Sequence, residues 1–492
     1  MKDLKAKTIR GGVARIVAQV TTFVVRIGSL MILARLLGPK DFGLVGMVTA
    51  FTGILNLFRD FGLSTATVQR ANVTDEQLST LFWINSLVGV ILGIVAVALA
   101  PALALFYHEP RLLWVTIVLA TGFLFNAGGV QHSALLQRHM RFTALGVINV
   151  VSLIVSTVIA ISMAKLGYGY WALVAMTIVA PLVSTIGCWI AAKWMPGRPQ
   201  RNIGLRSMMK FGGTLTLNSI VVYVAYNMEK VLLGKFWGAD AIGIYGRAYQ
   251  LVNIPTDNLN GAVGEVAFSA LSRVQDDPPR LRNYFLKGYS LVLGLTLPIT
   301  MISALFARDL IAVLLGPKWK DAVDIFRLLA PTILIFAMIN PTSWFLFALG
   351  KVERSLKIAL VIAPLVMGGY IIGLPYGPKG VALGYSVAMG LWVIPHIAWC
   401  VHGTMISFTD VLKTLSKPLI SGAVATVLPL LFLIFYGESS TAIVRLAIGG
   451  TAFSAVYLIM LLYVMGQKGF YLDLVRGMGS RGSIEEKALS PA

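Results

Sequence analysis

The sequence repeats one feature along most of its length, a run of apolar residues long enough to cross a lipid bilayer as a helix. A helical crossing needs about 20 residues. Only helices and closed barrels satisfy the backbone hydrogen bonds inside lipid. We therefore predict an all-α integral membrane protein with about 14 transmembrane helices, at residues 13–36, 42–67, 79–104, 111–135, 143–164, 168–192, 212–235, 242–270, 284–305, 322–348, 356–374, 380–401, 418–436 and 442–466.

The composition supports this class and excludes two others. Charged residues make up 13% of the chain and hydrophobic residues 57%, whereas soluble domains carry about 25% charged residues. A soluble enzyme and a disordered protein are thereby excluded. The segments between the apolar runs are too short to fold into a separate catalytic domain.

The basic residues predict how the chain is oriented. The net charge is +20, and in membrane proteins such an excess gathers in cytoplasmic loops, next to anionic lipid. With the N-terminus placed inside, 27 of the 41 Lys and Arg residues fall on the cytoplasmic side and 10 on the other. This predicts a multi-pass protein of a cytoplasmic membrane with both termini inside, and no nucleic-acid partner.

An internal repeat with an offset of about 200 residues divides the chain. Residues 37–46 align with residues 237–246, and the glycines at 38, 43 and 46 fall on those at 238, 243 and 246. Six predicted spans separate equivalent points, so the halves run in the same sense, as in two-lobed transporters. We predict two pseudo-symmetric six-helix lobes and two further helices, with an N-lobe at 1–195, a linker at 196–210, a C-lobe at 211–402, C-terminal helices at 403–466 and a tail at 467–492.

Polar residues form a stripe along the first predicted span. Gln19 and Arg26 lie on one helical face, and Arg26 is about 16 Å from the nearer end of the span at 1.5 Å per residue. A charge at that depth costs at least about 2.5–3.5 kcal/mol on insertion scales. We expect Arg26 to face water in a cleft, or alternatively to form an internal ion pair.

The repeat-related spans carry similar stripes. Tyr223, Tyr226 and Lys230 share a face of the seventh span, and Arg247 lies in the eighth. These residues predict a hydrated, cationic cleft lined by spans 1, 2, 7 and 8 that suits an anionic substrate. Two alternatives remain open: Lys230 pairs locally with Glu229 or extends to the surface, and Arg247 anchors the outer end of its helix.

Acidic residues are the minority in these spans. Asp257 and Glu265 are the candidates for binding a coupling ion, H⁺ or Na⁺, although Asp257 also fits a hydrogen-bonded polar core and Glu265 lies close to the cytoplasmic face. Arg59 and Asp60 fit a pair that caps a loop.

Motifs for catalysis are absent from the sequence. The five histidines form no HExxH pair, and no P-loop GxxxxGK[ST] occurs. We predict a protein that is not an enzyme, without a metal site, catalytic residues or a cofactor.

Several strings together resemble one known family. They are ARLLGPKDFGLVGM at 34–47, RDFGLSTATVQR at 59–70, ALLQRHMRF at 134–142, LLGPKWKDA at 314–322, FRLLAP at 326–331 and GPKGVALGYS at 377–386. Their order and spacing resemble the Wzx-type polysaccharide exporters of the multidrug/oligosaccharidyl-lipid/polysaccharide flippase superfamily, in the colanic acid, succinoglycan and teichuronic acid exporter branch.

This resemblance implies a flippase for undecaprenyl-pyrophosphate-linked oligosaccharides in the bacterial inner membrane, working by ion-coupled alternating access. It implies Arg26 as a substrate-binding base and, with less support, Lys230 and Arg247. A polysaccharide polymerase and a chain-length regulator are the implied protein partners.

Three other functions remain open at this point. A multidrug or organic-ion antiporter is disfavoured by the positive charge of Arg26. A lipid II flippase shares a cationic cavity but fits the strings less well. A membrane glycosyltransferase or polymerase is disfavoured by the lack of a large outer loop.

Overall fold

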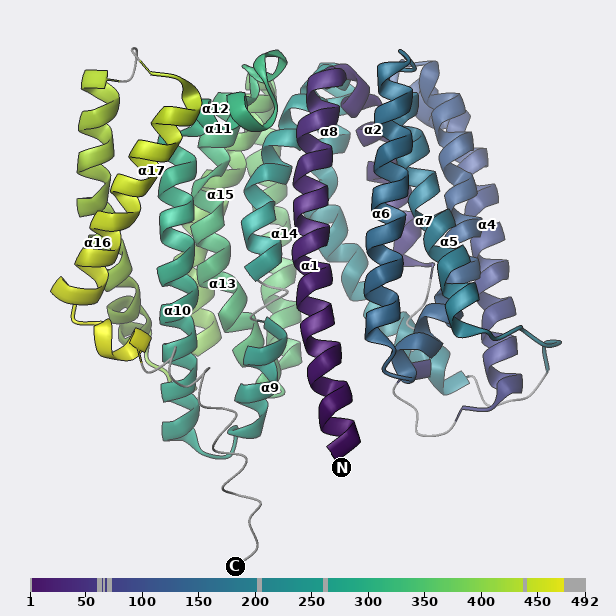
Figure 1. Ribbon diagram of the computed structural model, residues 1–492, viewed down its shortest axis with the longest axis horizontal. Coiled ribbons are helices and arrows are strands. Elements are labelled where there is room, and N and C mark those ends of the chain that lie inside the picture. Colours follow the sequence, from purple (N-terminus) through teal and green to yellow (C-terminus); the bar gives the residue numbers. More distant parts are fainter. Residues whose placement is uncertain are drawn as a thin grey trace, which may run out of the picture. The chain divides into compact units, whose positions relative to one another are not determined.

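The computed structural model describes residues 2–59, 64, 67–68, 73–200, 206–259, 264–436 and 440–472 (Figure 1). All regular secondary structure within these ranges is helical, which confirms the predicted all-α class. Ten stretches of the described helices are long and apolar enough to span a membrane. Two of them, Ala322–Ala348 and Glu353–Val401, each contain two α-helices, whereas the more polar α2 and α8 are not among the ten. The count of 14 crossings therefore stays a prediction.

The contacts divide the chain into two compact units. The first comprises residues 1–247, 314–322 and 359–385, and the second comprises 248–313, 323–358 and 386–492. The helices that lie wholly in the first unit are α1 (Lys2–Leu36), α2 (Pro39–Leu57), α4 (Asp75–Tyr107), α5 (Arg111–Arg138), α6 (Phe142–Lys165) and α7 (Trp171–Ala192).

Three long helices contribute to both units, and the second unit holds most of the remaining elements. The shared helices are α8 (Arg206–Leu259), α14 (Val352–Gly373) and α15 (Gly377–Val401). Elements of the second unit include α9 (Glu265–Arg273), α10 (Pro278–Leu305), α11 (Ala307–Leu314), α12 (Ala322–Leu329), α13 (Pro331–Ala348), α16 (Phe408–Tyr436), α17 (Ala442–Ile459) and a π-helical turn at Met460–Val464.

One predicted span differs from the structure at its ends, and the break predicted between two others is present. The span predicted at 42–67 begins at Pro39, and α2 ends at Leu57, where the backbone N–H of Phe58 bonds to the carbonyl of Leu55 in a tight final turn. The spans predicted at 212–235 and 242–270 both lie in α8, which consists of two helices joined at a kink, where Gly238 has a positive φ of 79°. Glycine alone adopts that conformation without strain.

Small residues allow the helices of the first unit to approach closely. A side chain at Gly89 of α4 would overlap Ala127 of α5. Between α5 and α7, the Thr185 hydroxyl donates to the carbonyl of Phe125 at 2.7 Å, and the Trp189 indole donates to that of Gly128 at 2.7 Å. Helices in membranes associate through such small-residue contacts and interhelical hydrogen bonds.

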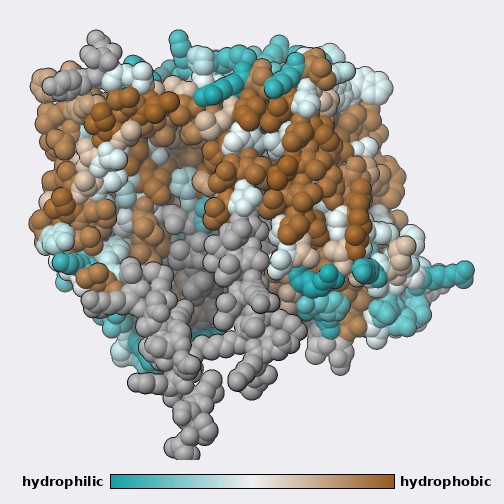
Figure 2. Space-filling model, in the orientation of Figure 1, coloured by the Kyte–Doolittle hydropathy of each residue, from teal (hydrophilic) through white to brown (hydrophobic). Residues whose placement is uncertain are grey.

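The outward faces of these helices are apolar. Figure 2 shows hydrophobic side chains over the middle of α4 to α7 on the face in view, with hydrophilic side chains gathered towards the helix ends. Ile94 and Ile190 are 63% and 70% exposed. Such faces suit contact with lipid rather than water, so the chain is a multi-pass membrane protein.

The segment between α10 and α12 contains α11 and a short 3₁₀ turn, Pro317–Trp319. In the first unit, this turn closes the C-terminal end of α1. The buried Trp319 indole donates to the carbonyl of Ala34 at 2.8 Å, and the Lys318 ammonium donates to that of Leu36 at 3.2 Å. Carbonyls in the last turn of a helix have no partner within the helix, and these side chains provide one.

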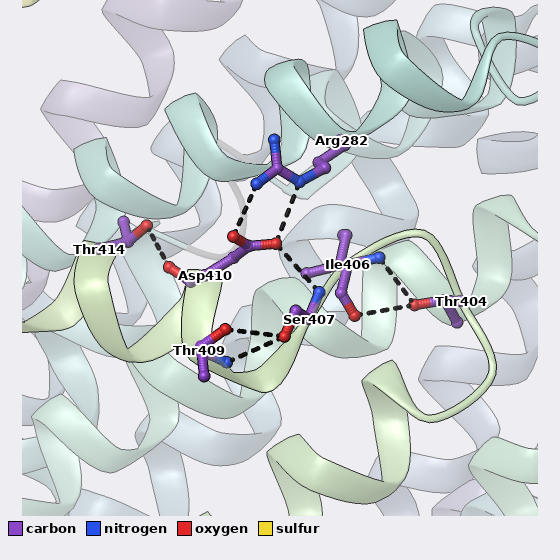
Figure 3. A network of polar contacts seen from close by, with 7 residues as sticks. All are labelled: Arg282, Thr404, Ile406, Ser407, Thr409, Asp410 and Thr414. Carbon is purple, nitrogen blue, oxygen red and sulfur yellow. Dashed lines mark hydrogen bonds and ion pairs between the residues drawn. The ribbon is translucent and has the colours of Figure 1, made fainter.

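In the second unit, α10 joins the C-terminal helices. An apolar cluster brings together Leu297, Ala425, Phe453 and Tyr457. Near the start of α16, Arg282 of α10 forms two hydrogen bonds with the Asp410 carboxylate, at 2.6 and 3.0 Å (Figure 3). The two helices predicted to follow the lobes thus pack as α16 and α17 against α10.

Candidate functional site

The two copies of the internal repeat meet within the first unit. A side chain at Gly43 of α2 would overlap the backbone carbonyl of Ala239, and one at Gly243 of α8 would overlap that of Pro39. With an offset of 200 residues, Gly43 corresponds to Gly243, and Pro39 to Ala239. The contact is therefore reciprocal, as expected where two related elements cross at a pseudo-two-fold axis.

Arg247 lies beside this crossing. Its guanidinium is 4.2 Å from the centre of the Phe42 ring, and the same ring packs edge-on against Trp319 with centroids 5.4 Å apart. A guanidinium over an aromatic face is attracted by the ring's quadrupole. Arg247 thus lies against an aromatic group of the protein, and its assignment to substrate binding stays a prediction.

Lys230 also has a local partner, although not the one considered from the sequence. Its ammonium donates to the side-chain carbonyl of Asn227 at 2.6 Å. The neighbouring Glu229 is fully buried, and neither of its carboxylate oxygens has a hydrogen-bond partner. The sequence alone indicates Glu229 only as a partner for Lys230, because an acidic residue next to a base suggests a local pair.

The predicted tyrosines lie on the same helix, α8. The Tyr223 hydroxyl donates to the carbonyls of Thr49 and Ala50 on α2, at 3.3 and 3.4 Å. Its ring end occupies the space that a side chain at Gly53 would need. Tyr223 therefore joins α2 and α8, whereas Tyr226 is half-buried and has other contacts. The assignment of both tyrosines to substrate binding stays a prediction.

The stripe on α1 is more open. Gln19 and Arg26 are both exposed, and no ion pair engages the Arg26 guanidinium within the described part of the chain. The alternative of an internal ion pair for Arg26 thus finds no partner there. Ser29, three residues after Arg26, is buried and is 5% exposed.

The two acidic candidates receive less support from the structure. Asp257 is exposed and has an interaction partner. The Glu265 side chain lies outside the described residues, although its backbone begins α9. Their assignment to ion coupling stays a prediction.

The polar face of α2 borders a cavity of about 210 Å³ inside the first unit. Its polar lining comes from α2, α5 and α7 and consists of Thr49, Thr52, Asn56, Asn126 and Thr177. The α2 side chains bond back to their own helix, for example Asn56 to the carbonyl of Thr52 at 3.1 Å. Such groups suit a hydrated surface better than a dry one.

Comparison with known proteins places the chain in a family. The family described as polysaccharide biosynthesis protein matches residues 32–324. The lipopolysaccharide biosynthesis protein WzxC of Escherichia coli K12 is 25% identical over 458 residues, which cover 91% of this chain and 88% of that protein. The succinoglycan biosynthesis transport protein ExoT of Rhizobium meliloti is 24% identical, over 93% of this chain and 94% of that protein.

Solved structures share the fold. The lipid II flippase MurJ, in an inward closed conformation, superposes with a TM-score of 0.75 at 15% identity, over 94% of this chain and 100% of that one. An inward-facing multidrug transporter of the MATE family in the MOP superfamily gives 0.63 at 16% identity, over 82% and 99%. The resemblance seen in the sequence strings is confirmed: the chain belongs to the polysaccharide biosynthesis protein family, as a Wzx-type member of the multidrug/oligosaccharidyl-lipid/polysaccharide flippase superfamily.

Proposed function

We propose that this protein is a flippase for surface polysaccharide biosynthesis. It moves an oligosaccharide repeat unit, linked to undecaprenyl pyrophosphate, across the bacterial inner membrane by alternating access. The observation that carries this proposal is the similarity, over nearly the full length, to proteins named for polysaccharide biosynthesis and transport. The likeness to MurJ and to the multidrug transporter supports the transporter fold and does not choose between their substrates.

The chemistry of the helices supports an anionic substrate. The exposed Arg26 guanidinium on α1 is a charge that a membrane helix carries at a cost. A pyrophosphate group offers oxygens that match the planar fork of an arginine. The polar side chains of α2 and the tyrosines of α8 would accompany a hydrated glycan.

The orientation, the partners and the energy source of the protein are part of the same proposal. Both termini lie in the cytoplasm, and the partners are membrane lipid, a polysaccharide polymerase and a chain-length regulator. No reaction is catalysed and no cofactor is needed. An H⁺ or Na⁺ gradient supplies the energy, with Asp257 and Glu265 as the candidate coupling residues.

The test measures movement of the substrate itself. Purified protein in proteoliposomes receives labelled undecaprenyl-pyrophosphate-linked repeat unit, and its appearance in the opposite leaflet is followed. Arg26→Ala should abolish transfer, whereas Arg26→Lys, which keeps the charge without the fork, should retain part of it. Wild-type transfer by Arg26→Ala would remove Arg26 from the mechanism, and no transfer by the wild type under an imposed ion gradient would contradict the function.

A further inference from the structure

The internal repeat also relates two connections between helices, one in each half of the chain. Residues 136–142, LQRHMRF, resemble residues 349–355, LGKVERS, at an offset of 213. Arg138 thus corresponds to Lys351, and Arg141 to Arg354. The first connection precedes α6 and the second precedes α14. A feature that both copies share is explained by the fold, whereas a feature of one copy needs a separate explanation.

The second arginine of each connection has the same structural role. Arg141 donates from Nη1 to the carbonyl of Ala191 at 2.6 Å, in the last turn of α7. Arg354 donates from Nη1 to the carbonyl of His402 at 2.7 Å, directly after α15, and to two carbonyls at the end of α15 at 3.3 and 3.4 Å. Carbonyls at the end of a helix have no partner within the helix, and a cation stabilises them. This contact caps one helix in each half of the chain.

A pocket of about 570 Å³ lies beside the second connection, in the second unit. Its described lining consists of Gly350, Lys351, Glu353, Arg354, Lys357 and Trp399. The three cations recur at every third residue, which places them on neighbouring turns at the start of α14. No ion pair engages any of them, or Glu353, within the described part of the chain. The described lining therefore carries an excess of positive charge.

Two residues of this pocket differ from the first copy of the repeat. Lys357 corresponds to Ala144 at the offset of 213, and its side chain is exposed. Trp399 corresponds to Trp189, because α15 and α7 align at an offset of 210. The Trp189 indole donates to the carbonyl of Gly128 at 2.7 Å, whereas no hydrogen bond engages the Trp399 indole N–H among the described residues. The helix cap accounts for neither Lys357 nor the free indole.

The capping residues of the second copy also retain unused donors. An arginine has five N–H donors, and all three contacts of Arg354 use Nη1. Its Nε and Nη2 have no hydrogen-bond partner in the described structure, and both are accessible to solvent. The Lys351 ammonium has one long contact, at 3.4 Å to the carbonyl of Gly403. The Nε–Nη2 edge of a guanidinium matches two oxygens of a phosphate group.

Outward-facing apolar side chains lie close to the pocket along both helices. Leu356 precedes Lys357 on α14, and Leu391 and Ile394 lie within eight residues of Trp399 on α15; all three are exposed. In a membrane protein such side chains contact lipid chains, and tryptophan is enriched where the chains meet the headgroups. Basic pockets between transmembrane helices bind anionic headgroups. The pocket thus combines a cationic lining with an apolar surface beside it.

We propose that this pocket binds the headgroup of an anionic phospholipid of the surrounding membrane. The free edge of Arg354 binds two phosphate oxygens, and Lys351 and Lys357 supply further positive charge. The Trp399 indole donates to an oxygen of the headgroup. A free phosphate has the same chemistry, but the exposed apolar side chains beside the pocket favour a ligand with acyl chains. The site is separate from the substrate-binding bases proposed above and does not depend on their role.

Binding is measured by native mass spectrometry on the full-length protein in a neutral detergent, which counts the lipids bound to each molecule. One arm adds phosphatidylglycerol, a second adds phosphatidylcholine at the same concentration, and a third adds glycerol phosphate, the free headgroup. We expect phosphatidylglycerol to bind several-fold more tightly than either of the others. Equal affinities for the two lipids would overturn the proposal. Glycerol phosphate that binds as tightly as phosphatidylglycerol would replace the lipid by a free anion.

Lysine variants decide whether the pocket is the site. Lys357→Gln should weaken phosphatidylglycerol binding about fivefold, since a basic residue near an anionic lipid surface contributes about 1 kcal/mol. Its exposed side chain has no partner among the described residues, so folding is not at risk. Lys413→Gln, at an exposed lysine of α16 outside the pocket, is the matched control and should leave the affinity unchanged. Equal weakening by both variants would indicate general attraction to a basic protein and would overturn the proposal, as would no effect of either.

The repeat provides a second control for the arginine. Arg354→Gln and Arg141→Gln each remove a helix cap, and both should lower the thermal unfolding midpoint measured without added lipid. Only Arg354→Gln should also weaken phosphatidylglycerol binding, by about tenfold or more, because it removes a charge-assisted pair of hydrogen bonds. An equal loss of binding in the two variants would show that the cap, and not the pocket, is responsible. If Arg354→Gln does not fold, Lys357→Gln decides the question.

Discussion

Gly43 of α2 packs against the backbone carbonyl of Ala239 so closely that no side chain fits between them. The repeat-related pair, Gly243 and Pro39, makes the same contact in return. Because backbone atoms form both contacts, a side-chain rotation relieves neither one, and the close approach requires glycine at both positions.

Alanine at either glycine should therefore destabilise the first unit. We expect Gly43→Ala and Gly243→Ala each to cost about 1–3 kcal/mol, the usual range for overpacking, and to lower the thermal unfolding midpoint. Gly246→Ala is the control, since no atom outside its own helix lies within 4 Å of a side chain there. It should be neutral or stabilising by up to about 1 kcal/mol, because alanine favours helix. Equal effects at positions 243 and 246 would contradict the contact.

The second prediction concerns the 3₁₀ turn at Pro317–Trp319, whose side chains bind carbonyls at the C-terminal end of α1. Trp319→Phe keeps the ring beside Phe42 but removes the donor to the Ala34 carbonyl. Leaving a buried acceptor without a partner costs about 1–3 kcal/mol. Trp114→Phe, at a tryptophan that is 62% exposed, is the matched control and should change the unfolding midpoint little. The two variants are compared by differential scanning fluorimetry, and a similar change in both would exclude the hydrogen bond as the cause.

The pattern of apolar residues in the sequence predicted well where the helices lie, but it predicted poorly which residues of other helices they contact. The span predicted at 111–135 agrees closely with α5 at Arg111–Arg138, and the span predicted at 143–164 agrees with α6 at Phe142–Lys165. These bounds could be predicted because a helix that crosses the membrane requires an apolar run of a given length. The glycine repeat likewise predicted which elements correspond. It did not predict that Gly43 would meet Ala239.

The partners of the polar residues depend on contacts between distant parts of the chain. Arg59, whose predicted partner Asp60 lies outside the described residues, meets Asn126, 67 positions away. Arg247 meets Phe42 of the other repeat copy. A single sequence contains the spacing along one helix but not the face that a second helix presents, so neither contact was predictable from it.

Substitutions of Arg282 and Asp410, which form an ion pair (Figure 3), should have unequal effects on the stability of the protein. Arg282 is 44% exposed, so Arg282→Gln should cost only about 0.2–1 kcal/mol. Asp410 also accepts from the backbone N–H of Ser407 at 3.0 Å and so caps α16. Asp410→Ala should therefore cost about 0.5–2 kcal/mol more, as loss of a cap does. Unfolding midpoints test the order, and a larger effect of Arg282→Gln would show that the cap contributes nothing.

A loop carboxylate gives a prediction that depends on pH. Between α4 and α5, Glu109 accepts two hydrogen bonds from Arg111, at 2.7 and 2.8 Å. Hydrogen bonding to the Arg111 side chain is the main cause that holds the pKa of the Glu109 carboxyl below its usual value. A lowered pKa in the folded state stabilises the protein above the unfolded-state pKa of about 4.3. That contribution is lost as the pH falls through the folded-state pKa.

Glu109→Gln should therefore lower the unfolding midpoint at pH 7 and have little effect under strongly acidic conditions. The effect at pH 7 should not exceed about 1 kcal/mol, since the pair is partly exposed. Arg111→Gln should show the same dependence, because it removes the other half of the pair. A difference between wild type and Glu109→Gln that stays constant from pH 7 to pH 3 would contradict this account.

The last prediction concerns Glu229. Its carboxyl group is fully buried, and neither oxygen has a hydrogen-bond partner. Lys230, the nearest base along the chain, is engaged with Asn227 instead. An ionised carboxylate without a partner is far more costly to bury than a neutral one. Glu229 is therefore expected to carry a proton in the folded protein. Glu229→Gln, which preserves the shape and the neutral state, should leave the unfolding midpoint within about 0.5 kcal/mol of the wild type. Glu229→Ala, which leaves a cavity, should lower it by about 2–5 kcal/mol, the range for truncating large buried side chains. A Gln variant as unstable as the Ala variant would mean that the carboxylate is charged and paired in the folded state.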